Sequence, residues 1–206
     1  MNYIIETIFP TNLVTTNIDR VLTKEELEVI AHYKKPENLH DNTGNLTSND
    51  KYVLDTCPAF SNLKKEITEA LNYYVSNIII PRNEFNIYIT QSWLNYTEPG
   101  ENHHTHYHSN SIISGVMYLH AEKDKDAIQF HRKEENLIRI TSAVYTPLNA
   151  MIWRYPVKTG DIVLFPSATI HNVESTISED TRISLAFNTF ATGLMGRHED
   201  LTSLKL

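Results

Sequence analysis

Histidines are concentrated in one short stretch of this 206-residue chain. Four of its ten histidines, His103, His104, His106 and His108, fall within six residues. Residues two apart on a strand point to the same side, so His106 and His108 can converge on one metal ion. Imidazole binds iron, zinc, copper and nickel alike. The cluster therefore predicts a metal site without naming the metal.

A third ligand is expected about sixty residues further along the chain. There a strand-like run at 160–166 leads to His171, which we expect a barrel to place opposite the first pair. Arg182 follows eleven residues later, and a guanidinium grips a carboxylate through two parallel hydrogen bonds. This order suits a barrel that holds one metal ion with a carboxylate-bearing ligand beside it.

The N-terminal part of the chain has helical patterns. Thr23 and Glu26 have capping-box spacing, which predicts a short helix. Apolar residues at three- and four-residue steps predict a longer helix that begins near Pro58 and ends at Pro81. Residues 4–18 are expected to be extended, and the polar, Asn-rich residues 37–50 are expected to form a loop.

After Pro81 the pattern becomes strand-like. The predicted strands cover residues 85–96, 111–120, 127–131, 150–155, 161–165 and 182–190. Helices followed by short strands predict an α+β fold, with a cupin-like jelly roll and the N-terminal helices packed on one face. The length predicts a single domain over 1–206, with helical support at about 1–82 and the jelly-roll core at about 83–192.

Composition narrows the class of protein. The net charge of −7 argues against a nucleic-acid surface, which is normally basic. Cys57 is the only cysteine, so no internal disulfide can form and no oxidising compartment is implied. No secretory signal or membrane-length apolar run is visible. We therefore expect a cytoplasmic protein without a membrane partner, and leave open a homodimer.

The ordered motifs of residues 85–190 resemble the 2-oxoglutarate- and iron(II)-dependent oxygenases, in particular their prolyl-hydroxylase-like branch of uncharacterised bacterial and phage proteins. The matching segments are residues 93–95, 99–100, 106–108, 114–119, 160–166, His171 and 182–188. The resemblance implies a double-stranded β-helix with iron(II) bound by His106, His108 and His171.

The same resemblance assigns the cosubstrate site. It implies that Arg182 pairs with the far carboxylate of 2-oxoglutarate, with contacts from Ser184 and Asn95. One departure stands out: the second iron ligand of the family is usually a carboxylate, and His108 occupies that position here. The chain either has a three-histidine site or uses another register.

Two literal His-x-acid strings compete with His106 and His108. His120-Ala121-Glu122 is the serious rival, whereas His198-Glu199-Asp200 follows His171 and so has the wrong order. We favour His106 and His108, because the Pro99-Gly100 turn lies just upstream and a strand-like run just downstream.

The sequence predicts a 2-oxoglutarate- and iron(II)-dependent dioxygenase that uses molecular oxygen to hydroxylate a small molecule or a protein side chain. One alternative is a three-histidine cupin-type dioxygenase without 2-oxoglutarate, in which Arg182 would bind the substrate's own carboxylate. Another is a non-enzymatic jelly-roll binding or structural module. Residues 37–50 and 123–146 are expected to shape the substrate pocket, but they carry no recognisable signature.

Overall fold

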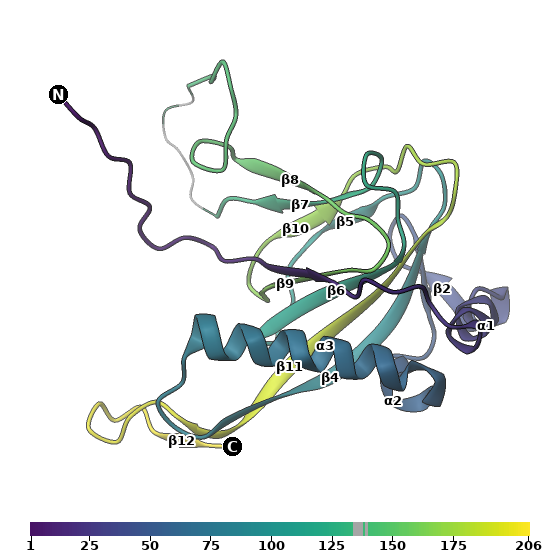
Figure 1. The fold of residues 1–206 in the computed structure, drawn as a ribbon, viewed down its shortest axis with the longest axis horizontal. Coiled ribbons are helices and arrows are strands. Elements are labelled where there is room, and N and C mark those ends of the chain that lie inside the picture. The colour runs from purple at the N-terminus through teal and green to yellow at the C-terminus, as the bar shows by residue number, and fades with distance from the viewer. Residues whose placement is uncertain (134–137, 139) are drawn as a thin grey trace.

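The computed structural model describes residues 1–133, 138 and 140–206, and it is built around two antiparallel sheets (Figure 1). The larger sheet has the strand order β1-β9-β6-β11-β4-β3-β2, with β12 paired to β11, and the smaller has the order β5-β10-β7-β8. The strands of the larger sheet are β1 Val14–Asn17, β2 Leu39–Asp41, β3 Leu46–Ser48, β4 Phe85–Thr97, β6 Ile113–His120, β9 Asp161–Pro166, β11 Arg182–Met195 and β12 Leu204–Lys205. Those of the smaller sheet are β5 His103–His106, β7 Ala127–His131, β8 Ile152–Pro156 and β10 His171–Val173.

The helices begin and end close to where the sequence predicts. Helix α1 (Lys24–Tyr33) has the predicted capping box, in which Thr23 and Glu26 satisfy each other's backbone N–H groups. Helix α3 (Ser61–Tyr74) continues as the π-helical turn η3 (Val75–Ile79) and stops at Ile80, which has a left-handed φ of 47° before Pro81. The shorter elements are η1 (Pro36–Asn38), α2 (Val53–Thr56) and η2 (Pro58–Phe60).

Two apolar cores hold these layers together. The first lies between α3 and the outer face of the larger sheet, where α3 crosses the strands (Figure 1). Its fully buried residues include Leu63 and Ile67 of α3 and Leu94, Leu185 and Leu164 of the sheet. Residues four apart on α3 lie on one side of the helix, and alternate residues of a strand lie on one side of the sheet. The helical and strand periodicities of the sequence therefore bring both sets of apolar residues into this core.

The second core lies between the two sheets. Tyr118 and Phe165 of the larger sheet belong to the same buried cluster as Ile128 and Phe130 of the smaller one. Alternate residues of the long strands thus face either the helices or the smaller sheet. This arrangement confirms the expected double-stranded β-helix with helices covering one face, and it leaves one end of the inter-sheet space for polar side chains.

The prediction of a loop over residues 37–50 was wrong. This segment forms the hairpin β2–β3, and β3 extends the larger sheet through the pairs Leu46–Tyr96 and Thr47–Asn95. Thr47 is buried, and its hydroxyl donates to the Leu94 carbonyl at 3.0 Å. Buried hydrogen bonds of this kind let a short, largely polar segment extend a sheet, which the Asn-rich sequence around it does not indicate.

The other segment expected to shape a pocket, residues 123–146, includes 134–137 and 139, which lie outside the described residues. Within the described part of the chain, no helix is long and apolar enough to cross a membrane.

Candidate metal and cosubstrate site

Three histidines converge at one end of the smaller sheet. His106 of β5 and His171 of β10 are direct partners in the antiparallel pairing, with ring centroids 4.3 Å apart. The Nε2 atoms of His108 and His171 lie 3.3 Å apart. Two nitrogens that bind one metal at about 2.1 Å and at right angles are about 3 Å apart, so this spacing fits shared coordination.

The strands position this triad differently from the expected arrangement. His171 does not lie across the barrel from His106, since it occupies the adjacent strand. His108 lies just beyond the end of β5, where its backbone N–H donates to the Ser167 carbonyl at 2.9 Å. The triad therefore combines one strand, the turn that follows it, and the neighbouring strand.

Two rings of the triad have a backbone carbonyl oxygen behind them. The Nδ1 of His106 lies 2.8 Å from the His104 carbonyl oxygen, and that of His171 lies 2.9 Å from the Thr169 carbonyl oxygen. Since carbonyls only accept, each Nδ1 must carry the proton, which leaves the lone pair on Nε2. The Asn188 side chain acts on the His108 ring and opposes the lowering of its pKa. Such outer partners fix metal-ligating histidines, so the three residues fit a metal.

Burial keeps these imidazoles neutral. It lowers the pKa of His108 to about 4 and that of His171 to about 3, and the neighbouring histidine His106 adds to both shifts. Burial also lowers the pKa of His106. Neutral imidazole is the form that binds metal, so the environment stabilises the required protonation state.

Arg182 begins β11, deep between the sheets. It is 3% exposed, and its Nη2 donates to the Thr97 hydroxyl at 3.1 Å. Its Nε and Nη1 have no hydrogen-bond partner among the residues that the structure describes. A buried guanidinium with two unused donors is costly, and a carboxylate is the group that such a fork binds best. Arg182 therefore fits one end of a dicarboxylate.

Asn95 and Ser184 lie beside Arg182. They face each other in the β4–β11 pairing, two residues along from the pair Thr97–Arg182, and both are buried. Within the described part of the chain, the Oδ1 of Asn95 also lacks a partner. The structure thus brings together the three residues that the sequence suggested for cosubstrate binding, Asn95, Arg182 and Ser184.

A second histidine group adjoins the triad. One ring nitrogen from each of His103, His104 and His106 lies within 4.8 Å of the others. The His103 and His106 rings are stacked with centroids 4.6 Å apart, and the side-chain amide of Asn42 lies 3.3 Å from the Nε2 of His103. His106 belongs to both groups, so a substitution of His104 tests which of the two groups binds the metal.

The rival registers are not assembled into sites. His120 is half-exposed and lies 3.8 Å from an Asp180 carboxylate oxygen. Glu122 instead accepts from the Ser178 hydroxyl and pairs with Lys125 at 2.9 Å. His198 lies near the C-terminus among exposed residues. Among the described residues, neither string joins a group of three metal-binding side chains.

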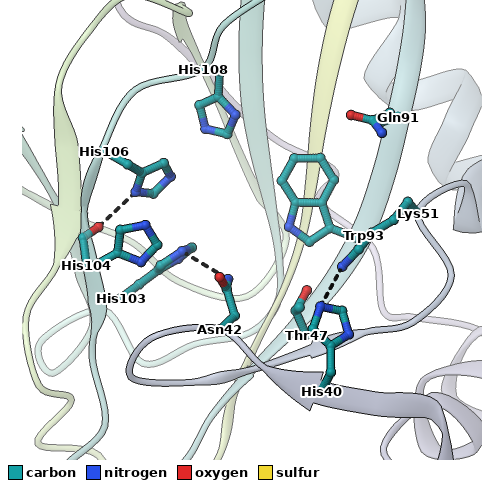
Figure 2. Close-up of a pocket in the computed structure, with 10 residues that line it drawn as sticks. All are labelled: His40, Asn42, Thr47, Lys51, Gln91, Trp93, His103, His104, His106 and His108. Atoms are coloured by element: carbon teal, nitrogen blue, oxygen red, sulfur yellow. Dashed lines mark hydrogen bonds between the residues drawn. The ribbon is translucent and has the colours of Figure 1, made fainter.

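A cavity of about 380 Å³ opens beside the triad (Figure 2). The histidine side of its wall comes from β5 and the turn that follows, and the opposite side comes from the β2–β3 hairpin, Lys51 and β4. The Trp93 indole lies between the two sides, with its centroid 6.1 Å from that of the His108 ring. The lining residues are His40, Asn42, Thr47, Lys51, Gln91, Trp93, His103, His104, His106 and His108.

Comparison with known proteins agrees with this geometry. Residues 91–188 match the sequence profile of a family described as "Putative 2OG-Fe(II) oxygenase". No curated protein sequence matches the chain. The matched segment contains Asn95 and Arg182 as well as the three triad histidines. The resemblance to 2-oxoglutarate- and iron(II)-dependent oxygenases is thereby confirmed, and iron(II) and 2-oxoglutarate are the cofactor and cosubstrate after which the matched family is named.

Solved structures share the fold at low sequence identity. A Pseudomonas putida prolyl-4-hydroxylase is 12% identical with a TM-score of 0.55, covering 86% of this chain and 92% of the other. A prolyl hydroxylase from Trichoplax adhaerens, in complex with a hypoxia-inducible-factor peptide fragment, is 14% identical with a TM-score of 0.56, covering 85% and 83%. HygX from Streptomyces hygroscopicus, with nickel, 2-oxoglutarate and hygromycin B bound, is 13% identical with a TM-score of 0.57, covering 87% and 83%. These likenesses support the double-stranded β-helix.

Several residues near the site were missed in the sequence. Thr97 directly follows the predicted strand 85–96 and gave no signal of its own, although it holds the Arg182 guanidinium. His40 belongs to the segment 37–50 that was expected to be a loop and Lys51 directly follows that segment, so nothing placed them beside the histidines. Trp93 lies in the matching segment 93–95 without an assigned role, and it lines the cavity. The pairing of the β2–β3 hairpin with β4 would have been the clue for His40 and Lys51, and the pairing of β4 with β11 the clue for Thr97.

Proposed function

We propose that this protein is a 2-oxoglutarate- and iron(II)-dependent dioxygenase that hydroxylates a small molecule or a protein side chain. The observation that carries the proposal is the pairing of two features: three convergent imidazoles, of which His106 and His171 have Nε2 free, and a buried guanidinium with two donors unused among the described residues. His106, His108 and His171 would hold iron(II), and Arg182 would hold the far carboxylate of 2-oxoglutarate.

The protein's own residues fix the orientation of the groups that would hold iron(II) and 2-oxoglutarate. Carbonyl oxygens of residues 104 and 169 fix the rings of His106 and His171, and Thr97 fixes the guanidinium of Arg182. Asn95 and Ser184 supply polar contacts beside it. When bound, iron(II) and 2-oxoglutarate together supply the oxidation by molecular oxygen, with succinate and carbon dioxide as coproducts. The cavity next to the triad would admit the substrate.

Substrate size follows from this cavity. About 380 Å³ is at the lower end of small-molecule pockets and suits a small molecule or one side chain of a protein. Among the structural neighbours, HygX has hygromycin B bound and the Trichoplax enzyme has a peptide bound, so both substrate types occur on this fold.

The test is oxygen consumption by the purified protein with iron(II), measured with and without 2-oxoglutarate. Consumption that requires 2-oxoglutarate and yields succinate supports the proposal. Because His108 replaces the usual carboxylate, a three-histidine dioxygenase is the second candidate, and it would consume oxygen with a suitable substrate without the keto acid. No turnover and no iron binding would leave a non-enzymatic jelly roll.

A further inference from the structure

The wall of the cavity opposite the histidines carries an unneutralised cation. Lys51 donates to the Ser48 carbonyl at 2.8 Å and lies 3.4 Å from the Nε2 of His40 (Figure 2). The Nδ1 of His40 lies 2.8 Å from the Asn49 side-chain oxygen, which leaves its Nε2 as an acceptor. Two of the three ammonium donors therefore have neutral acceptors, and the third has none among the described residues.

The acidic neighbour of Lys51 is engaged elsewhere. The Asp50 carboxylate accepts from the Tyr33 hydroxyl at 2.6 Å, from the backbone N–H of Tyr52 at 2.7 Å and from the Thr56 hydroxyl. Lys51 makes no ion pair within 4.0 Å to any carboxylate in the described part of the chain. Burial lowers its pKa, although the charge of Asp50 opposes this shift.

The rest of the cavity has the same electrostatic character. None of its lining residues is an aspartate or a glutamate, although the chain carries a net charge of −7. The wall offers amide groups from Asn42 and Gln91 and the face of Trp93. A single cation in a wall without carboxylates attracts an anion, and an indole face packs well against an apolar or planar group.

We propose that Lys51 binds an anionic group of the substrate, so that the enzyme acts on a carboxylate- or phosphate-bearing molecule whose body packs against Trp93. This proposal rests on the proposed function and specifies its substrate class. Lys51 is held in place, since its carbonyl accepts from the Ser92 N–H of β4 at 2.8 Å. Because one cavity contains both Lys51 and two of the triad histidines, an anion at Lys51 would bring the remainder of the molecule to the metal.

The test compares two probes of nearly equal shape, phenylacetate and phenylacetamide. Trp153→Phe leaves Trp93 as the single tryptophan, and its fluorescence is titrated in protein saturated with iron(II) and 2-oxoglutarate without oxygen. We expect phenylacetate to bind about fivefold more tightly than the amide, which is the effect of one partly exposed ion pair. Lys51→Gln should abolish this preference, and Lys51→Arg should retain it.

Lys65→Gln is the matched control, because it removes the same charge from the exposed face of α3. The proposal would be overturned if Lys51→Gln and Lys65→Gln showed the same preference for phenylacetate over phenylacetamide. It would also be overturned if the single-tryptophan protein bound both probes equally well or bound neither. The charge-transfer band of bound 2-oxoglutarate is recorded in the same samples. Lys51→Gln should leave this band unchanged. If the band were absent in every variant, that result would contradict the proposed function and not the role of Lys51.

Discussion

Arg182 and Thr97 are direct cross-strand partners on β11 and β4, and their hydrogen bond of 3.1 Å is the only one that the guanidinium makes to the described residues. Thr97 thus holds one side of the guanidinium of Arg182, while its Nε and Nη1 donors are buried and available to a ligand. Burial lowers the pKa of Arg182, with weaker opposition from Tyr118 and Asp126. A bound carboxylate would satisfy both free donors and offset the cost of burying the charge.

We therefore predict that Arg182→Ala weakens 2-oxoglutarate binding at least tenfold and leaves iron affinity nearly unchanged. A charge-assisted bidentate contact in a partly dry pocket is worth about 2–4 kcal/mol. Arg182→Lys should recover only part of the affinity, because an ammonium cannot reproduce the fork. Titration of 2-oxoglutarate into the anaerobic iron(II) protein, followed by the charge-transfer band, measures this. Equal affinity in wild type and Arg182→Ala would remove Arg182 from the site.

The iron content of histidine variants distinguishes which of the two histidine groups binds the metal. We expect His106→Ala and His171→Ala to lose bound iron while remaining folded, since each removes an Nε2 that faces the common centre. His104→Ala should keep one iron per chain, because His104 belongs only to the second group. Iron analysis after gel filtration, with circular dichroism as the fold control, decides the assignment. Loss of iron in His104→Ala but not in His171→Ala would move the ion to the second group, and loss in His120→Ala alone would restore the rival register.

A separate prediction concerns stability. The fully buried carboxylate of Glu26 accepts from both terminal nitrogens of Arg20 at 2.8 Å and from the Thr23 N–H at 2.7 Å. Burial disfavours its ionised form, but these hydrogen bonds outweigh it, so the pKa of Glu26 is lowered. Glu26→Ala should destabilise the protein by about 2 kcal/mol, because it leaves the Thr23 N–H without its acceptor and leaves Glu66 as the remaining acidic partner of Arg20.

The sign of the pH dependence follows from the lowered pKa. Glu26 contributes its stability at pH values above the unfolded carboxyl pKa of about 4.3, and that contribution is lost as the pH falls through the lower folded value. Urea unfolding of wild type and Glu26→Gln at neutral and acid pH measures it. The difference between the two proteins should shrink on acidification, and a constant difference would contradict the role of the charge.

The sequence predicts the fold better than the surroundings of the site. Strand periodicity locates β7 at its observed bounds and the start of β11 at Arg182, and the capping box locates α1. These signals are local. The pairing of His106 with His171 and of Thr47 with Asn95 depends on which strands become neighbours, and no local pattern encodes that choice.

The β2–β3 hairpin shows the reason most clearly. Its strands have three residues each, with polar side chains that a sequence pattern assigns to a loop. Tertiary hydrogen bonds to β4 override that local preference. The hairpin and Lys51 form one wall of the cavity. The β2–β3 hairpin, which the sequence pattern does not predict, is therefore also expected to contribute to substrate specificity.

The position of His108 gives the last prediction. Its Nε2 lies 3.3 Å from that of His171, at the place where the second ligand of the triad is required. Relatives usually have a carboxylate there, and a shorter aspartate would still present an oxygen on the same side. We expect His108→Asp to retain iron and to match or exceed the wild type in 2-oxoglutarate-dependent oxygen consumption, because a carboxylate also ligates iron(II) in a facial triad. His108→Ala, which offers no ligand, is the control and should bind iron more weakly than either protein. Iron content and the oxygen electrode give the two readouts. A His108→Asp protein that is folded but free of iron would show that this site requires three imidazoles.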